Sequence, residues 1–304
     1  MTPPFVPTIT HVMAASDLSA LAEQALARAF QIAVGQGATV SVAHVVNDRV
    51  LEQLQLLMGG KSALVEQQLQ DAARTRLQAQ IDAVNCDGIK PDIRLLVGEI
   101  ITSLLQEADH SNAGLLVLGA AGESRMRRFV LGATVERMLQ KTQRSLLVVR
   151  QPVTSPYRRI LVPVDFSAWS LPSLQMARML APETRLVLLH AYEVPFEGQL
   201  SLAGLDEGML QGYRTEARLQ GAAQLKALAA EAQLSEGDYD ILLRHGPAVA
   251  MIEQKLAQEG CDLVVMGKHG RGWMEEVLMG SATQHLVQEA GVDVLVVSKS
   301  MPSA

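Results

Sequence analysis

The amino-acid sequence predicts an α/β protein made of two tandem, doubly wound domains, each with a five-stranded parallel sheet. Three observations support this prediction. One set of residues recurs along the chain at a constant spacing, and short apolar segments alternate with longer amphipathic ones in each repeat. The 304 residues, of which 48% are hydrophobic, suffice for two cores of about 150 residues each.

An internal repeat with a spacing of 148 residues organises the chain. The matching pairs are Asp17 with Asp165, Gly98 with Gly246, Gly119 with Gly267, Gly122 with Gly270, and Gly132 with Gly280. His44 and His190 are 146 residues apart, so a small length change follows the second strand. Residues 151–157, QPVTSPY, have the prolines and small hydroxyl residues typical of a linker. We therefore expect domains at residues 1–150 and 151–304.

Strands and helices are expected to alternate in each repeat. Segments such as 115–118 and 263–266 are apolar throughout, which is typical of parallel strands covered by helices on both faces. In the first repeat we expect strands at 10–14, 39–45, 92–97, 115–118 and 145–149, and helices at 18–34, 62–84, 100–109 and 135–141. In the second we expect strands at 159–162, 186–190, 240–244, 263–266 and 293–297, and helices at 170–180, 213–233, 249–258 and 282–289. The glycine-rich residues 198–212 are expected to form a mobile loop. A ligand should bind outside the carboxyl ends of the strands.

Composition excludes several classes of function. The net charge of −6 and the pI near 5.7 argue against a general nucleic-acid binder. The N-terminal residues MTPPFVPTIT lack the regions of a signal peptide, and no stretch reaches the roughly 18 apolar residues of a membrane span. Cys86 and Cys261 have no metal-site spacing and fit buried thiols. We expect a cytoplasmic protein that binds neither nucleic acid nor membrane.

A glycine-rich stretch of the second repeat has the features of a phosphate-binding loop. Gly267 and Gly270 follow the apolar run 263–266, and nine further residues lead to Gly280 and Ser281. Without a Cβ atom, Gly267 and Gly270 can take positive φ and let phosphate oxygens approach the main chain. A helix beginning after this loop would offer free N–H groups, the positive end of its dipole and two hydroxyl donors to an anion. The residues expected at this helix start are Gly280, Ser281, Ala282 and Thr283.

This spacing resembles the nucleotide loop of the ATP-binding universal stress proteins. The resemblance covers nearly the whole chain and implies two Rossmann-like domains, ATP binding in the second, and a role in stress adaptation. It leaves open whether Mg²⁺ accompanies the ATP. It also implies that backbone groups of Pro163, Val164 and Ala191 border the adenine. In this family the last strands of two domains pair, so we expect 145–149 and 293–297 to pair within the chain as a pseudo-dimer. Pairing would protect two apolar edges, and further homodimerisation is left open.

Asp165 ends the first strand of the second repeat and permits two interpretations. A carboxylate there can accept hydrogen bonds from ribose hydroxyls, or it can cap the following helix. The resemblance favours the nucleotide, because the family uses the matching aspartate. Three basic residues of the loop can also face phosphates: Lys268, His269 and, as the best placed, Arg271.

The first repeat departs from the loop signature. Gly119, Gly122 and Gly132 keep their spacing, but the two hydroxyl residues are missing. Ala133 replaces Ser281, Val135 replaces Thr283, Glu123 replaces Arg271, and Ala15 replaces Pro163. Since a hydrogen bond to a charged group contributes about 1.5–3 kcal/mol, losing one weakens a site roughly ten- to a hundredfold. We interpret the first repeat as a degenerate site.

No arrangement of residues predicts catalysis. The sequence places no nucleophile beside a base, so we expect a binding protein with at most weak ATPase activity. His44 and His190 lack partners at metal-site spacing and are expected to pack or cap. Two alternatives stay open: a partner-binding protein whose glycines only maintain turns, and a slow ATP hydrolase. A nucleotidyl transferase or flavoprotein is less favoured, because further motifs are missing. The sequence identifies neither the protein partner nor the signal.

Overall fold

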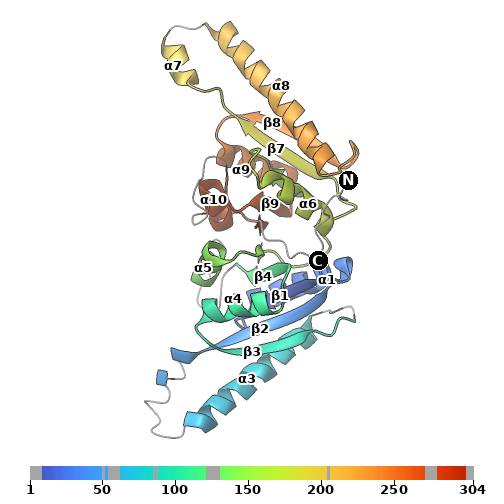
Figure 1. Cartoon of the computed structure of the whole chain (residues 1–304), viewed down its shortest axis with the longest axis vertical. Helices are drawn as coiled ribbons and strands as arrows, with labels where there is room; N and C mark the ends of the chain where they lie inside the picture. The colour runs from blue at the N-terminus through green and yellow to red at the C-terminus, as the bar shows by residue number, and fades with distance from the viewer. Residues whose placement is uncertain are drawn as a thin grey trace. The chain divides into compact units, whose positions relative to one another are not determined.

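The computed structural model describes residues 9–49, 52–53, 62–84, 86, 88–120, 131–203, 206–270 and 279–298 (Figure 1). The chain divides into two compact units. The first unit comprises residues 1–156 together with 287–304, and the second comprises residues 157–286. The last residues of the second repeat therefore belong to the first unit. The predicted boundary between 150 and 151 concerns the sequence repeats and stays a prediction.

The first unit is a sheet in the strand order β3-β2-β1-β4-β5-β10. Its strands are β1 (His11–Ala15), β2 (Thr39–Asn47), β3 (Asp92–Gly98), β4 (Leu115–Gly119), β5 (Ser145–Val149) and β10 (Asp293–Val297). Its helices are α1 (Ala20–Gln36), α3 (Ser62–Ala83), α4 (Ile100–His110) and α5 (Ala133–Lys141). Strands β1 to β5 pair in parallel, as the apolar runs predict. All five residues of β5 are buried, which fits a strand with both faces covered.

The last strands of the two repeats pair with each other. β10 lies antiparallel to β5, with Leu295 opposite Leu147 and Val296 opposite Leu146. The predicted pairing of 145–149 with 293–297 is confirmed. Each of these apolar strands thus gains a neighbour within the same chain, where a free edge would promote association.

The second unit is a parallel sheet in the order β9-β6-β7-β8. Its strands are β6 (Ile160–Pro163), β7 (Leu186–Tyr192), β8 (Tyr239–His245) and β9 (Leu263–Gly267). Its helices are α6 (Ser170–Leu180), α7 (Glu197–Leu202), α8 (Glu207–Glu231), α9 (Ala248–Glu259) and the start of α10 (Ser281–Glu289). This order matches β4-β1-β2-β3 of the first repeat, so the described parts of the repeats share one topology. The order reverses beside β6, where a doubly wound sheet binds its ligand.

Residues 198–212 differ from the prediction of a mobile loop. α7 covers Glu197–Leu202, and α8 begins at Glu207 rather than at Tyr213. Asp206 caps α8, because its carboxylate Oδ1 accepts a hydrogen bond from the Met209 N–H at 2.9 Å. The glycines masked this capping signal in the sequence.

His44 and His190 have equivalent structural roles. The Nδ1 of His44 donates to the Ser16 carbonyl, and that of His190 donates to the Val164 carbonyl, each at 2.8 Å. Each bond ties the end of the second strand of a repeat to the end of the first, so the prediction of packed or capping histidines is confirmed. Within the described ranges, no helix is long and apolar enough to span a membrane.

Candidate functional site

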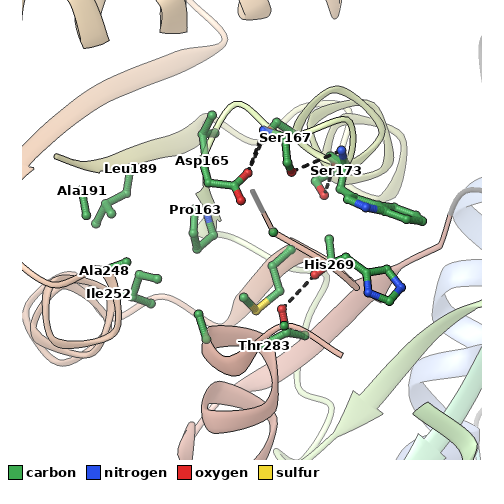
Figure 2. A pocket seen from close by; sticks show the side chains of 18 of the residues that line it. Pro163, Asp165, Ser167, Ser173, Leu189, Ala191, Ala248, Ile252, His269 and Thr283 are labelled. Carbon is green, nitrogen blue, oxygen red and sulfur yellow. Dashed lines mark hydrogen bonds between the residues drawn. The ribbon is translucent and has the colours of Figure 1, made fainter. Parts of the chain in front are cut away.

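A cavity of about 200 Å³ opens in the second unit, where the carboxyl ends of β6, β7 and β9 meet the beginning of α10 (Figure 2). Apolar residues lie on one side of it and polar residues on the other. The lining residues are Pro163, Val164, Asp165, Ser167, Trp169, Ser170, Ser173, Leu189, Ala191, Ala248, Ile252, Met266, Gly267, His269, Gly270, Gly280, Ser281, Ala282 and Thr283.

The predicted site residues converge on this cavity. Ten of the predicted binding residues line it: Pro163, Val164, Asp165, Ala191, Gly267, Gly270, Gly280, Ser281, Ala282 and Thr283. Arg271 lies outside the described residues. The sequence prediction missed the serines and Trp169 at the start of α6, which directly follow Asp165. It also missed Ala248 and Ile252 of α9, which belong to no motif.

The loop glycines are needed for close packing rather than for positive φ. A Cβ atom on Gly267 would overlap the Trp169 Cβ and would lie 3.0 Å from its Cγ. A Cβ on Gly270 would lie 3.0 Å from the Asp165 carboxylate. Neither glycine has positive φ, so that part of the prediction is wrong. A Cβ atom on Gly119 of the first repeat would likewise lie only 2.9 Å from the Leu21 carbonyl oxygen. The first glycine of the motif thus lets the end of its strand touch the start of the helix that follows the neighbouring first strand of the repeat.

The start of α10 is fastened to the loop by two hydrogen bonds. The Gly280 N–H donates to the Lys268 carbonyl at 3.0 Å, which corrects the expectation that this N–H is free. The Thr283 hydroxyl donates to the Gly267 carbonyl at 2.9 Å, so it stabilises the loop in this structure. The exposed Ser281 follows Gly280 at the first helical position. The N–H groups of a first helical turn have no partner within the helix, so Ser281, Ala282 and Thr283 can present theirs to an anion.

Asp165 closes the turn that precedes α6, whose N-cap is Trp169, so the interpretation of Asp165 as the helix cap is wrong. Its Oδ1 accepts hydrogen bonds from the Ser167 N–H and the Ser170 hydroxyl, both at 3.0 Å. Asp17 accepts from the Ser19 N–H at 3.1 Å in the first repeat. This aspartate-closed turn is therefore common to both repeats, and a bond from Asp165 to a ribose stays a prediction.

The other side of the cavity is apolar. Figure 2 shows Leu189, Ala191, Ala248 and Ile252 grouped there. The polar backbone groups of Val164 already have partners, because its N–H donates to the Leu189 carbonyl and its carbonyl accepts from His190. A flat ring placed against this wall would therefore gain apolar contact, whereas the backbone of Val164 is already hydrogen-bonded within the protein.

Two basic side chains of the loop are buried. Lys268 is 7% exposed, and burial lowers the pKa of its ammonium group. His269 is 8% exposed, and its ring centroid lies 5.3 Å from that of Trp169. The first repeat has Ala120 and Ala121 at these positions.

The first repeat keeps the backbone of this site but not its donors. The Gly132 N–H donates to the Ala120 carbonyl at 2.8 Å, as Gly280 does to Lys268. Gly132 caps α5 without a side-chain hydrogen bond, and Val135 is buried where the second repeat has Thr283. The predicted Gly122 and Glu123 lie outside the described residues.

The universal stress protein family model matches residues 8–150 and 156–298. The chain belongs to the universal stress protein family. Universal stress protein MJ0577 of Methanocaldococcus jannaschii is 27% identical over 160 residues, which cover 47% of this chain and 96% of that protein. Universal stress protein A homolog 2 of Coxiella burnetii is 29% identical over 144 residues, which cover 46% of this chain and 94% of that protein.

A solved universal stress protein from Archaeoglobus fulgidus resembles this tandem member of the family over its length. It has a TM-score of 0.63 and 18% identity, covering 96% of this chain and 99% of that one. This likeness shows a shared fold. The family matches show two universal stress protein domains in one chain, as the 148-residue repeat predicts.

Proposed function

We propose that the second repeat binds ATP in the cavity at the start of α10. The observation that carries this proposal is the convergence of ten predicted residues, drawn from β6, β7, β9, α10 and their loops, on one cavity.

Each side of the cavity suits a different part of the nucleotide. The first turn of α10 offers N–H groups, the positive end of the helix dipole and the Ser281 hydroxyl to phosphates. The wall formed by Leu189, Ala191 and Ile252 suits the adenine ring. Asp165 borders the space between them and can accept a hydrogen bond from a ribose hydroxyl in addition to the bonds within its turn.

The cavity is smaller than the roughly 300–1,000 Å³ of typical small-molecule sites. We therefore place only part of the nucleotide inside it. Within the described ranges, no three His, Cys, Asp or Glu side chains could together hold a metal ion. Any Mg²⁺ would enter bound to the phosphates, with Asp165 as the carboxylate that borders the cavity.

The first repeat should not bind ATP with comparable affinity. It has Ala133 and Val135 in place of two hydroxyl residues, and alanines in place of the buried basic pair. We propose one nucleotide per chain, with ATP controlling interactions with a protein partner during stress adaptation. Hydrolysis is not part of this proposal.

Calorimetric titration of the nucleotide-stripped protein with Mg-ATP tests the proposal. We expect one site per chain, and a roughly tenfold or greater loss of affinity in Ser281→Ala, because a hydrogen bond to phosphate is lost. Thr134→Ala, one residue beyond the counterpart of Ser281, is the matched control and should bind as the unmodified protein does.

Two sites of similar affinity would show that the missing hydroxyls of the first repeat matter little. Absence of binding would overturn the proposal and favour a protein that acts through partner binding alone. Phosphate release from bound ATP, measured on the same samples, would show whether the protein is instead a slow hydrolase.

A further inference from the structure

His269 has an unusual environment in the loop between Gly267 and Gly270. Its side chain lines the cavity and is more than nine-tenths buried. One face of the imidazole contacts Trp169, with ring centroids 5.3 Å apart and ring planes inclined by 44°. Figure 2 shows His269 across the cavity from Ile252.

The Nδ1 atom of this ring is shielded from solvent and has no hydrogen-bond partner within the part of the chain that the structure describes. Burying a polar nitrogen without a partner is unfavourable compared with leaving it in water. Asp165 and Thr283, two other polar residues that line the cavity, do have partners. His269 is therefore a polar group of the cavity whose hydrogen bonding is incomplete.

The internal repeat gives a second observation. Gly119 and Gly132 match Gly267 and Gly280, yet Ala121 stands at the position of His269 and Ala133 at that of Ser281. The first repeat thus forms the same backbone hydrogen bond of the loop although it lacks the histidine. The imidazole is present in the repeat that also has the hydroxyl at the helix start.

We propose that His269 is a phosphate-binding residue of the ATP site, an inference that rests on the proposed function. Nδ1 donates a hydrogen bond to a phosphate oxygen, either as the neutral Nδ1–H tautomer or as the imidazolium. Because Nδ1 is shielded in this structure, the imidazole turns about its side-chain bonds when the nucleotide binds. The first turn of α10 and His269 then approach the phosphates from two elements.

A packing role against Trp169 is the competing explanation, since Leu21 and Ala121 replace this pair in the first repeat. His269→Phe separates the two explanations, because phenylalanine keeps an aromatic contact with Trp169 and removes the nitrogen. His269→Gln retains a hydrogen-bond donor and serves as the conservative variant.

The test measures the affinity of each variant for two ligands, Mg-ATP and adenosine. Mg-ATP affinity is determined by calorimetry, and adenosine affinity by ligand-observed NMR, which reads millimolar binding. We expect His269→Phe to weaken Mg-ATP binding roughly ten- to a hundredfold and to leave adenosine binding unchanged. His269→Gln should recover most of the lost affinity. A variant that disturbed only packing would weaken both ligands together.

Unchanged Mg-ATP affinity in His269→Phe, or equal losses for Mg-ATP and adenosine, would overturn the role of His269 and leave the proposed function standing. Failure of the unmodified protein to bind Mg-ATP would overturn both. Circular dichroism checks that the variants fold. Should the phenylalanine variant unfold, His269→Leu also removes the nitrogen, and the difference between its Mg-ATP and adenosine affinities separates the two explanations.

Discussion

Gly267 is the residue whose replacement should affect the loop most directly. A methyl group there would overlap the Trp169 Cβ, which cannot move without shifting the start of α6. We expect Gly267→Ala to lower the free energy of unfolding by about 1–3 kcal/mol, the usual effect of overpacking. Gly291→Ala is the control, because a Cβ at Gly291 meets no atom within 4 Å and its φ is not positive. Urea unfolding of both variants would measure the difference, and equal stabilities would contradict the packing role.

At the residue scale, the sequence shows which residues share the site but not which atoms they engage. The spacing of Gly267, Gly270 and Gly280 predicts a common site, and these residues do line one cavity. The hydroxyl of Thr283 and the N–H of Gly280 were expected to be free, yet both donate to carbonyls of the loop. These partners lie 12 to 16 residues away along the chain, so local sequence pattern does not reveal them.

Among the elements, one carboxylate ties α7 to both α8 and β8. Glu197 accepts a hydrogen bond from Arg214 Nε of α8 at 2.6 Å and pairs with His245 Nε2 at the end of β8 at 2.8 Å. The bond from Arg214, followed by that from His245, lowers the pKa of Glu197. Because the folded pKa lies below the unfolded one, the carboxylate stabilises the docked helix at neutral pH. This stabilisation is lost as the pH falls from the ordinary carboxyl range through the lowered folded value.

We therefore expect Glu197→Gln to expose α7 at pH 7. The protection of residues 197–202 against hydrogen exchange, relative to the intrinsic rate at the same pH, should fall in this variant at pH 7, and in the unmodified protein only below about pH 4. Glu207→Gln is the matched control, since Glu207 bonds to the same Arg214 from within α8 and does not hold α7. Equal exchange in both variants would show that other contacts hold the helix.

Element type was predictable wherever the pattern was long and apolar, and less so where the chain is polar. The strand predicted at 263–266 appears as β9, and that at 145–149 as β5. α8 was predicted to begin six residues too late, because glycines at 208 and 212 resemble a loop. Propensity disfavours glycines within a helix, whereas the Asp206 cap favours a helix that begins at Glu207.

At the scale of the whole chain, the second repeat completes the first unit through a buried ionic network. Asp293 is fully buried at the start of β10, and Arg28 of α1, 4% exposed, lies 3.5 Å from its Oδ2. The Asp293 Oδ1 accepts from the Arg150 N–H at 2.8 Å and the Gln151 N–H at 3.1 Å. The Arg28 guanidinium also donates to the Ser155 carbonyl at 3.0 Å. The linker predicted from its prolines is thus fixed at both ends by residues more than 120 positions away, which composition alone does not reveal.

Asp293→Asn should lower the free energy of unfolding more than the loss of an ordinary surface ion pair does. It would leave the buried Arg28 without its counter-charge, and breaking such pairs costs about 3–5 kcal/mol. Asparagine keeps an acceptor for the linker N–H groups, so we expect a loss near 3 kcal/mol. Asp240→Asn is the control, because its pair with Arg185 is more than half exposed and should contribute under about 1 kcal/mol. Denaturant unfolding of both variants gives the comparison.

The double variant Arg28→Met with Asp293→Asn completes the cycle. Removing both charges eliminates the unpaired Arg28 cation, while the partly buried Arg150 beside Asp293 stays charged, so the double variant should be more stable than Asp293→Asn alone. If Arg28→Met added its own full cost instead, the two residues would act independently. The linker contacts of Asp293, rather than its charge, would then hold β10 against β5.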